Sequence, residues 1–128
     1  MPEPELDPLV QRAVASAVVE RASVELRKLL RGLAAALDPF PSFQGIGSLQ
    51  AVEVDPSGVR DADRGCVVVC PDGVLYELVL RMVPGPPDVG GVDQVEELRE
   101  LDLSPGDYVA YAYAAVGELV RIIEARVR

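Results

Sequence analysis

The residues best suited to chemistry in this chain are two cysteines, Cys66 and Cys70, which lie four positions apart in the segment RGCVVVCPDG. The valines between them predict a strand, in which residues i and i+4 lie ~13 Å apart. A disulfide needs Cα atoms within about 7 Å of each other, so these thiols cannot bond while the strand persists. The sequence has no histidine and no third cysteine to complete a zinc site. We therefore interpret both cysteines as small core residues, with a reactive thiol as the alternative.

Other patterns that could support chemistry are incomplete. Without histidine, neither Ser-His-Asp nor Cys-His activation of a nucleophile is open to this chain. The stretch Gly45-Ile46-Gly47 lacks the later glycine and the lysine of a phosphate-binding loop. The acids Asp55, Asp61, Asp63 and Asp72 lack the order of an EF-hand, so we expect them to be solvated. We predict no catalytic residues, no metal site and no cofactor.

Composition and charge exclude several classes of function. The 128 residues are 49% hydrophobic, which predicts one folded domain over 1–128 with its own core. The net charge of −9 has the wrong sign for binding nucleic acid or an anionic membrane surface. No apolar run is long enough to span a bilayer, and the acidic start MPEPELDPLV does not resemble a signal peptide. We expect a cytoplasmic protein.

A long helix is predicted over 7–37, with Asp7 as N-cap, Pro8 in the first turn and Asp38-Pro39 as the stop. At 100° per residue, its second half has an ordinary apolar face, made by Val18, Val19, Ala22, Leu26, Leu29, Leu30, Leu33 and Leu37. Its first half has a second apolar face, rotated by more than a quarter turn, made by Leu6, Val10, Ala13, Val14 and Ala17. Either the helix breaks near Val19, or its halves pack against different partners, one of which could be a second chain.

Three strands of a β-meander are predicted over 48–82, at 48–54, 65–70 and 74–82. If the turn Pro71-Asp72-Gly73 closes a hairpin, period 2 puts one set of side chains on one face: Cys66, Val68, Cys70, Val74, Tyr76, Leu78 and Leu80. We interpret this as the core face. The opposite face is also apolar and is expected to be half covered or a contact surface.

Two more helices are predicted, an acidic one over 93–101 and a terminal one over 105–127. Asp93 with Glu96 matches a capping box, and Ser104-Pro105 is a strong helix start. The terminal helix has two adjacent apolar stripes, wider than contact with one sheet requires. It is either a central helix between the sheet and the first helix, a subunit interface, or a helix that lines a ligand site.

Together these elements predict an α+β fold: a small three-stranded antiparallel sheet with helices packed mainly on one face, in the order α-β-β-β-α-α. A homodimer would cover the surplus apolar surface, so we expect a non-enzymatic interaction or adaptor protein that binds a second copy and another protein. The candidate interface residues are Val10, Val14, Val109, Tyr113, Val116 and Val120.

Two other functions stay open. One is a small-molecule-binding domain with a pocket between the sheet and the terminal helix, lined by Tyr76, Arg81, Tyr108 and Tyr111. The other is a small enzyme that works without histidine, through carboxylates, tyrosine or a thiol.

Overall fold

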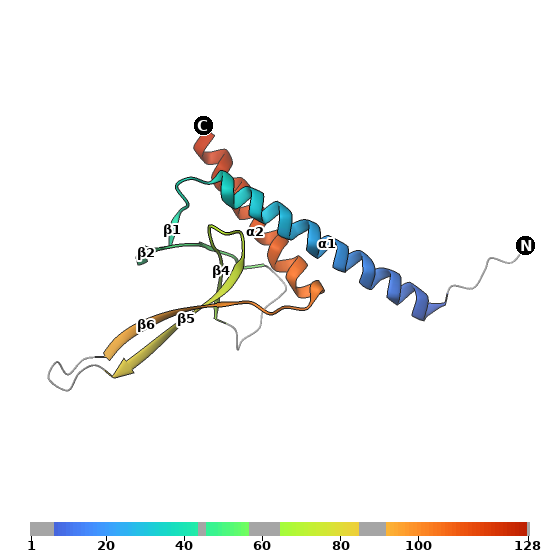
Figure 1. Cartoon of the computed structure of the whole chain (residues 1–128), viewed down its shortest axis with the longest axis horizontal. Helices are drawn as coiled ribbons and strands as arrows, with labels where there is room; N and C mark the ends of the chain where they lie inside the picture. The colour runs from blue at the N-terminus through green and yellow to red at the C-terminus, as the bar shows by residue number, and fades with distance from the viewer. Residues whose placement is uncertain (1–6, 44–45, 57–64, 85–91, 128) are drawn as a thin grey trace, which may run out of the picture.

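The computed structural model describes residues 7–43, 46–56, 65–84 and 92–127, and of residues 46–48, 80–84 and 92–96 it describes the backbone alone. Within these residues the chain is α+β, as predicted, with two helices and two antiparallel sheets (Figure 1). The elements follow the order α1 (Pro8–Ala36), β1 (Ser42–Phe43), β2 (Ile46–Gln50), β3 (Val52–Glu53), β4 (Cys66–Val69), β5 (Leu75–Pro84), β6 (Val92–Glu100) and α2 (Pro105–Val127). One sheet pairs β1 with β2, and the other has the strand order β3-β4-β5-β6.

Helix α1 is continuous through Val19, so the predicted break near that residue is wrong. Asp7 caps it as expected: its carboxylate accepts a hydrogen bond of 2.9 Å from the Leu9 N–H, and Pro8 follows in the first turn. At the other end, the Leu37 N–H donates to the Ala34 carbonyl oxygen at 3.2 Å. The other alternative, that the two halves pack against different partners, stays a prediction, because residues 8–18 of the first half are exposed in this chain.

Helix α2 starts where the sequence signals placed it. The Tyr108 N–H donates to the Ser104 carbonyl oxygen at 2.9 Å, and the Asp107 N–H donates to the Ser104 hydroxyl at 3.4 Å. Figure 1 shows α2 crossing α1 with the two helices running in the same general direction. Because α2 starts farther along that direction, the first turns of α1 extend beyond it.

The predicted acidic helix over 93–101 is wrong, because this segment forms strand β6. It pairs antiparallel with β5 over nine positions, from Tyr76↔Glu100 to Pro84↔Val92. The capping-box pattern is a local signal, whereas pairing with the long strand β5 satisfies the backbone groups that the two strands turn toward each other. The predicted order α-β-β-β-α-α and the three-stranded sheet are wrong for the same reason.

The predicted strand 48–54 is divided between the two sheets. Its first part belongs to β2 and pairs with β1, and its second part is β3, which pairs with β4 through Val52↔Val69. Strand β1 lies between the predicted helix 7–37 and the predicted strand 48–54, where no element was predicted. The Ala51 N–H, between β2 and β3, donates to the Pro41 carbonyl oxygen at 3.1 Å.

The β4–β5 hairpin has the predicted register and turn. Val69 pairs with Leu75, and the Gly73 N–H donates to the Cys70 carbonyl oxygen at 2.8 Å. Gly73 has a φ of 77°, which favours glycine. A Cβ atom at this position would also lie 2.7 Å from the Arg31 Cα. The turn therefore packs directly against the backbone of α1 and anchors the sheet to the helix.

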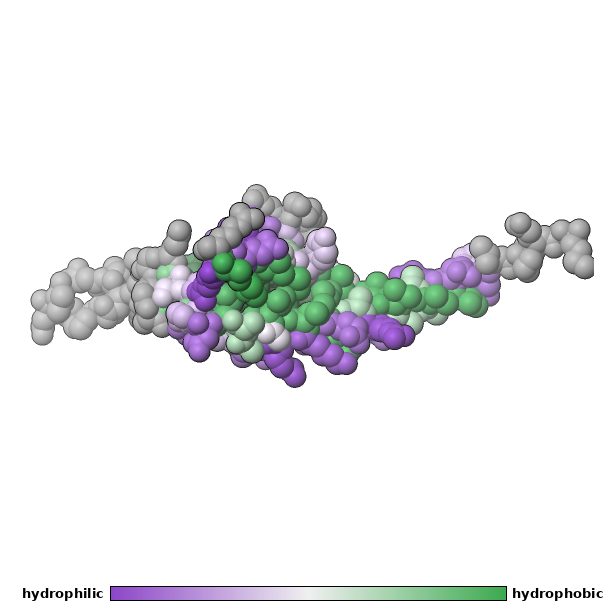
Figure 2. All heavy atoms as spheres, turned by 90° about the horizontal axis from the view of Figure 1, so that it is seen from above, coloured by the Kyte–Doolittle hydropathy of each residue, from purple (hydrophilic) through white to green (hydrophobic). Residues whose placement is uncertain are grey.

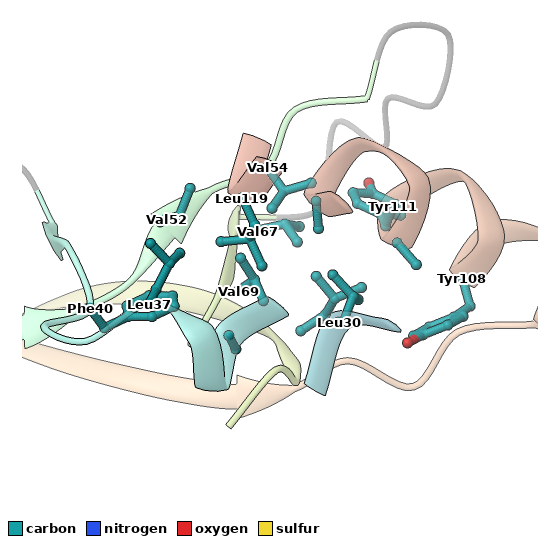
Figure 3. Close-up of a cluster of buried hydrophobic side chains, with 14 residues drawn as sticks. Leu30, Leu37, Phe40, Val52, Val54, Val67, Val69, Tyr108, Tyr111 and Leu119 are labelled. Atoms are coloured by element: carbon teal, nitrogen blue, oxygen red, sulfur yellow. The ribbon is translucent and has the colours of Figure 1, made fainter. Parts of the chain in front are cut away.

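The main core lies between the two helices and one face of the four-stranded sheet (Figure 3). Its residues include Leu30 from α1, Leu37 directly after that helix, Tyr111 and Leu119 from α2, and Val52, Val54, Val67, Val69 and Leu75 from the sheet side. A smaller cluster on the opposite face joins Ala51, Val68 and Cys70 to Phe43, Leu49, Cys66 and Tyr76. Where side chains are described, Cys66, Val68, Cys70 and Tyr76 share one face as predicted. The prediction that this is the core face is wrong, because the helices cover the opposite face, which carries Val67, Val69 and Leu75. The small β1–β2 sheet contributes Phe43 and Leu49 to the face that carries the cysteines.

Candidate functional site

The two cysteines are free and lie in the smaller core cluster. Burial, the negative charge of Glu53 and the hydrogen bond that the thiol donates to the Glu53 carboxylate raise the pKa of Cys66 to about 11. Burial and the charge of Asp72 raise the pKa of Cys70 to about 11 as well. Both thiols therefore stay protonated at neutral pH, which disfavours nucleophilic or redox chemistry.

Tyr76 and Asp72 form a small polar unit at the end of the same hairpin. The Tyr76 hydroxyl donates to Asp72 Oδ2 at 2.6 Å, while Asp72 Oδ1 accepts from the Val74 N–H at 2.9 Å. The hydrogen bond, burial and the charge of Asp72 raise the pKa of Tyr76 to about 12. Because both carboxylate oxygens hold the turn, we interpret this pair as structural.

The four residues predicted to line a pocket are not brought together. Tyr108 and Tyr111 are buried in the main core, whereas Tyr76 packs on the opposite face of the sheet. Arg81 lies in β5, and its side chain is outside the described part of the structure. Beside Tyr108 there is a cavity of about 50 Å³, room for a water molecule or two but well below the ~300 Å³ that a drug-sized ligand needs.

Arg27 and Tyr108, which both line this small cavity, form a cation–π contact. The Arg27 guanidinium lies over the Tyr108 ring, 4.3 Å from its centre. Burial raises the pKa of the Tyr108 hydroxyl, while the charges of Arg27 and Arg31 lower it. The contact joins α1 to the first turn of α2, so its role is to hold the two helices together.

The four candidate interface residues of α2 have different surroundings. Val116 packs against the main core, and Val109 and Val120 are half-buried. Only Tyr113 among these four is largely exposed, at 75%. Most of the doubled apolar stripe of α2 is thus used inside this chain.

The first turns of α1 form the largest run of exposed apolar side chains in the described residues. We call residues 8–18 the α1 arm: every residue in it is exposed, including Leu9 at 78%, Val10 and Val14 at 53% and Val18 at 62%. Figure 2 shows this apolar surface continuing along the projecting helix. The inward-facing residues begin only at Val19, and the first fully buried leucine is Leu30.

The α1 arm has little helical stability of its own. Its eleven residues span about 16 Å, and a helix this short is marginal in water unless an apolar face packs against something. Valine adds to the cost because its branched side chain loses freedom in a helix. Val18 and Leu29, predicted on the core face, are also exposed, since they lie at the margin of that face.

The described residues contain neither a cluster of metal ligands nor a helix that could span a membrane. No group of three or more metal-ligating side chains occurs there. Asp61 and Asp63 lie outside the described residues, as does Gly45, while Ile46 and Gly47 open strand β2. Neither α1 nor α2 contains a stretch that is both long enough and apolar enough to cross a bilayer.

Comparison with known proteins gives no match: no family model, no curated protein and no solved structure resembles the chain.

The sequence reasoning missed one feature, the outer edge of β6. Strand β6 pairs with β5 on one side only, and in the described residues no strand pairs with its other side. A groove of about 620 Å³ lies next to it, lined by Leu49, Tyr76 and Leu98 together with Ser42, Gln50, Cys70, Pro71 and Asp72. The signal that could have found it is the length of the apolar strand β5, which extends beyond its pairing with β4 and so requires a further strand.

Proposed function

We propose that this protein is a non-enzymatic, cytoplasmic interaction protein that works as a homodimer, joined through the α1 arm. The observation that carries the proposal is the exposure of Leu9, Val10, Val14 and Val18 on a helix that leaves the body of the protein. Apolar surface of this extent on a projecting helix marks an interaction site. Burying it would stabilise the arm as well as the complex.

The exposed side chains favour a second helix as the occupant. On a helical wheel, one stripe covers less than a third of the circumference on the side of α1 away from the core, and it contains Val10, Ala13, Val14, Ala17 and Val24. Val24 is 49% exposed and extends the stripe past the arm. The two alanines of the stripe allow the axes of two helices to approach closely.

The charges along α1 favour a second copy in antiparallel orientation. In the described residues, the acid Asp7 precedes the first turn of α1, whereas the basic residues Arg27, Lys28 and Arg31 lie in its last third. An antiparallel pair centred near Ala17 would place Asp7 of one copy opposite Arg27 and Lys28 of the other. It would also align the two helix dipoles favourably, whereas a parallel pair would place like charges together.

The alternatives have less support. The cavity between the sheet and α2 has a volume of about 50 Å³, too small for the predicted ligand pocket. The raised pKa values of Cys66 and Cys70 work against a thiol enzyme.

The test is the oligomeric state of two matched variants, measured by size-exclusion chromatography with light scattering. Val14→Glu adds one negative charge to the exposed stripe, and Ser16→Glu adds the same charge two residues away on the opposite side of the helix. We expect a wild-type dimer, at least ~100-fold weaker dimerisation in Val14→Glu, and little change in Ser16→Glu. A monomeric wild type at 100 µM, or a Val14→Glu variant as dimeric as Ser16→Glu, would overturn the proposal.

A further inference from the structure

Strand β6 is the exposed edge of a ribbon that projects from the body of the protein. Beyond the start of the ribbon, Figure 1 shows β5 and β6 running together away from both helices. In the described residues β6 lies alongside β5 and has no strand on its outer side. A two-stranded ribbon is only marginally stable in water, so a third strand would stabilise it.

The hydrogen bonds identify which residues of β6 face the open edge. The Leu101 N–H donates to the Leu75 carbonyl oxygen at 3.2 Å, so residue 101 points toward β5. In an antiparallel pair this direction alternates along the strand. The backbone groups of Glu97 and Arg99 therefore pair with β5, while those of Glu96, Leu98 and Glu100 point outward.

The charge of β6 selects the kind of strand that can pair there. Residues 92–100 contain four acids and one arginine, and Arg99 is in an ion pair with Glu97 at 3.3 Å. Pairing with a second copy of β6 would bring two strands of net negative charge together. Their repulsion disfavours self-association through this edge. A basic strand would instead gain from charge complementarity along the whole edge.

Leu98 connects the edge to the neighbouring groove. Its backbone points outward, and its side chain, 38% exposed, lines the groove with Tyr76 and Leu49. Side chains of a paired strand alternate between the two faces of a sheet. Every second residue of an added strand would therefore lie on the face that carries this groove.

We propose that β6 is a docking strand, which binds an extended, positively charged segment of another protein by strand addition. Backbone pairing at Glu96, Leu98 and Glu100 supplies the register, the acids of β6 select lysine or arginine, and Leu98 contacts an apolar side chain. The proposal goes beyond dimerisation and does not depend on it.

The probe is a fluorescein-labelled nine-residue peptide of alternating lysine and valine, titrated with the full-length protein and followed by fluorescence anisotropy. We expect saturable binding, and none with a peptide in which glutamate replaces lysine. N-methylation of alternate peptide amides keeps the charge but blocks strand pairing, so it should weaken binding at least tenfold. No binding of the lysine peptide, or equal binding of the methylated one, would overturn the proposal.

A matched pair of variants tests the protein side of the interaction. Glu96→Pro removes an outward N–H that β5 does not use, and Glu96→Thr removes the same carboxylate but keeps the N–H. We expect at least tenfold weaker binding for Glu96→Pro and a change of about twofold for Glu96→Thr, with circular dichroism as the check on folding. Equal losses in the two variants would contradict strand addition.

The peptide titration, read together with the oligomeric state of the wild-type protein, separates this proposal from the dimer. Peptide binding by a protein that is monomeric even as wild type would support the docking strand while the dimer proposal fails. A stable wild-type dimer that does not bind the peptide would support the dimer and overturn the docking strand.

Discussion

Two parts of the molecule leave its body in opposite directions and expose opposite kinds of surface (Figure 1). The α1 arm has its backbone hydrogen bonds satisfied inside the helix and exposes apolar side chains such as Leu9 and Val18. Strand β6 exposes backbone groups along one edge and carries mostly charged side chains. The arm can gain stability only by burying side chains, and the strand chiefly by pairing its backbone.

This difference separates self-association from recognition of another protein. Apolar side chains on a helix accept an identical helix, because burial is not selective for charge. An acidic edge disfavours an identical edge and favours a basic one. One small chain can thus form a dimer at one end and bind a partner at the other without the two surfaces competing.

The largest expected effect is the difference in unfolding free energy between truncating a buried leucine of the body and truncating an exposed leucine of the arm. Leu30 is fully buried, so Leu30→Ala should lower the free energy of unfolding by about 3 kcal/mol. Leu9 is 78% exposed, so Leu9→Ala should cost less than about 0.5 kcal/mol in a Val14→Glu background, where no dimer forms. Urea unfolding followed by circular dichroism measures both, and equal losses would show that the arm packs against its own chain.

A smaller loss is expected at the turn that fixes the sheet against α1. Gly73→Ala would place a Cβ at a φ of 77° and 2.7 Å from the Arg31 Cα, so we expect a loss of about 2 kcal/mol in unfolding free energy. Gly32→Ala is the control, because a Cβ there meets nothing within 4 Å and alanine favours the helix by up to ~1 kcal/mol. If Gly73→Ala is as stable as Gly32→Ala, the turn does not anchor the sheet.

The smallest effect distinguishes the two surfaces by their response to salt. Raising sodium chloride from 50 to 500 mM should weaken binding of the lysine–valine peptide roughly tenfold, because the ions screen the acids of β6. The dimer should change less than about threefold, since it depends on apolar burial. Anisotropy gives the dissociation constant of the peptide complex, and sedimentation equilibrium gives that of the dimer. A dimer that salt weakens more than the peptide complex would contradict this distinction between the two surfaces.

The elements predicted correctly from the sequence are those whose ends are marked by capping or turn residues. Asp7 and Ser104 mark helix starts, and Pro71-Asp72-Gly73 marks the hairpin turn, so α1, α2 and the β4–β5 register follow from nearby residues. The rotated stripe that includes Val10 and Val14 indicated that the first half of α1 has different surroundings from the second.

The errors have a common physical origin in long-range contacts. The apolar residues of β6 and its end recur every third position, at Val92, Val95, Leu98 and Leu101, which is a helical spacing. This segment becomes a strand because it pairs with β5, and that pairing is a tertiary contact that local spacing does not reveal. Both faces of the sheet are apolar, so periodicity alone did not determine which face the helices would cover.

Hydrogen–deuterium exchange of the wild-type protein over a range of concentrations tests the central claim most directly. If the α1 arm joins two copies, amides 9–18 will be protected at high concentration and will exchange faster on dilution below the dimer dissociation constant. The amides of Leu30 and its neighbours should change far less. Fast exchange in the arm at every concentration, up to 100 µM, would contradict the account, because it would leave this apolar helix without a second copy.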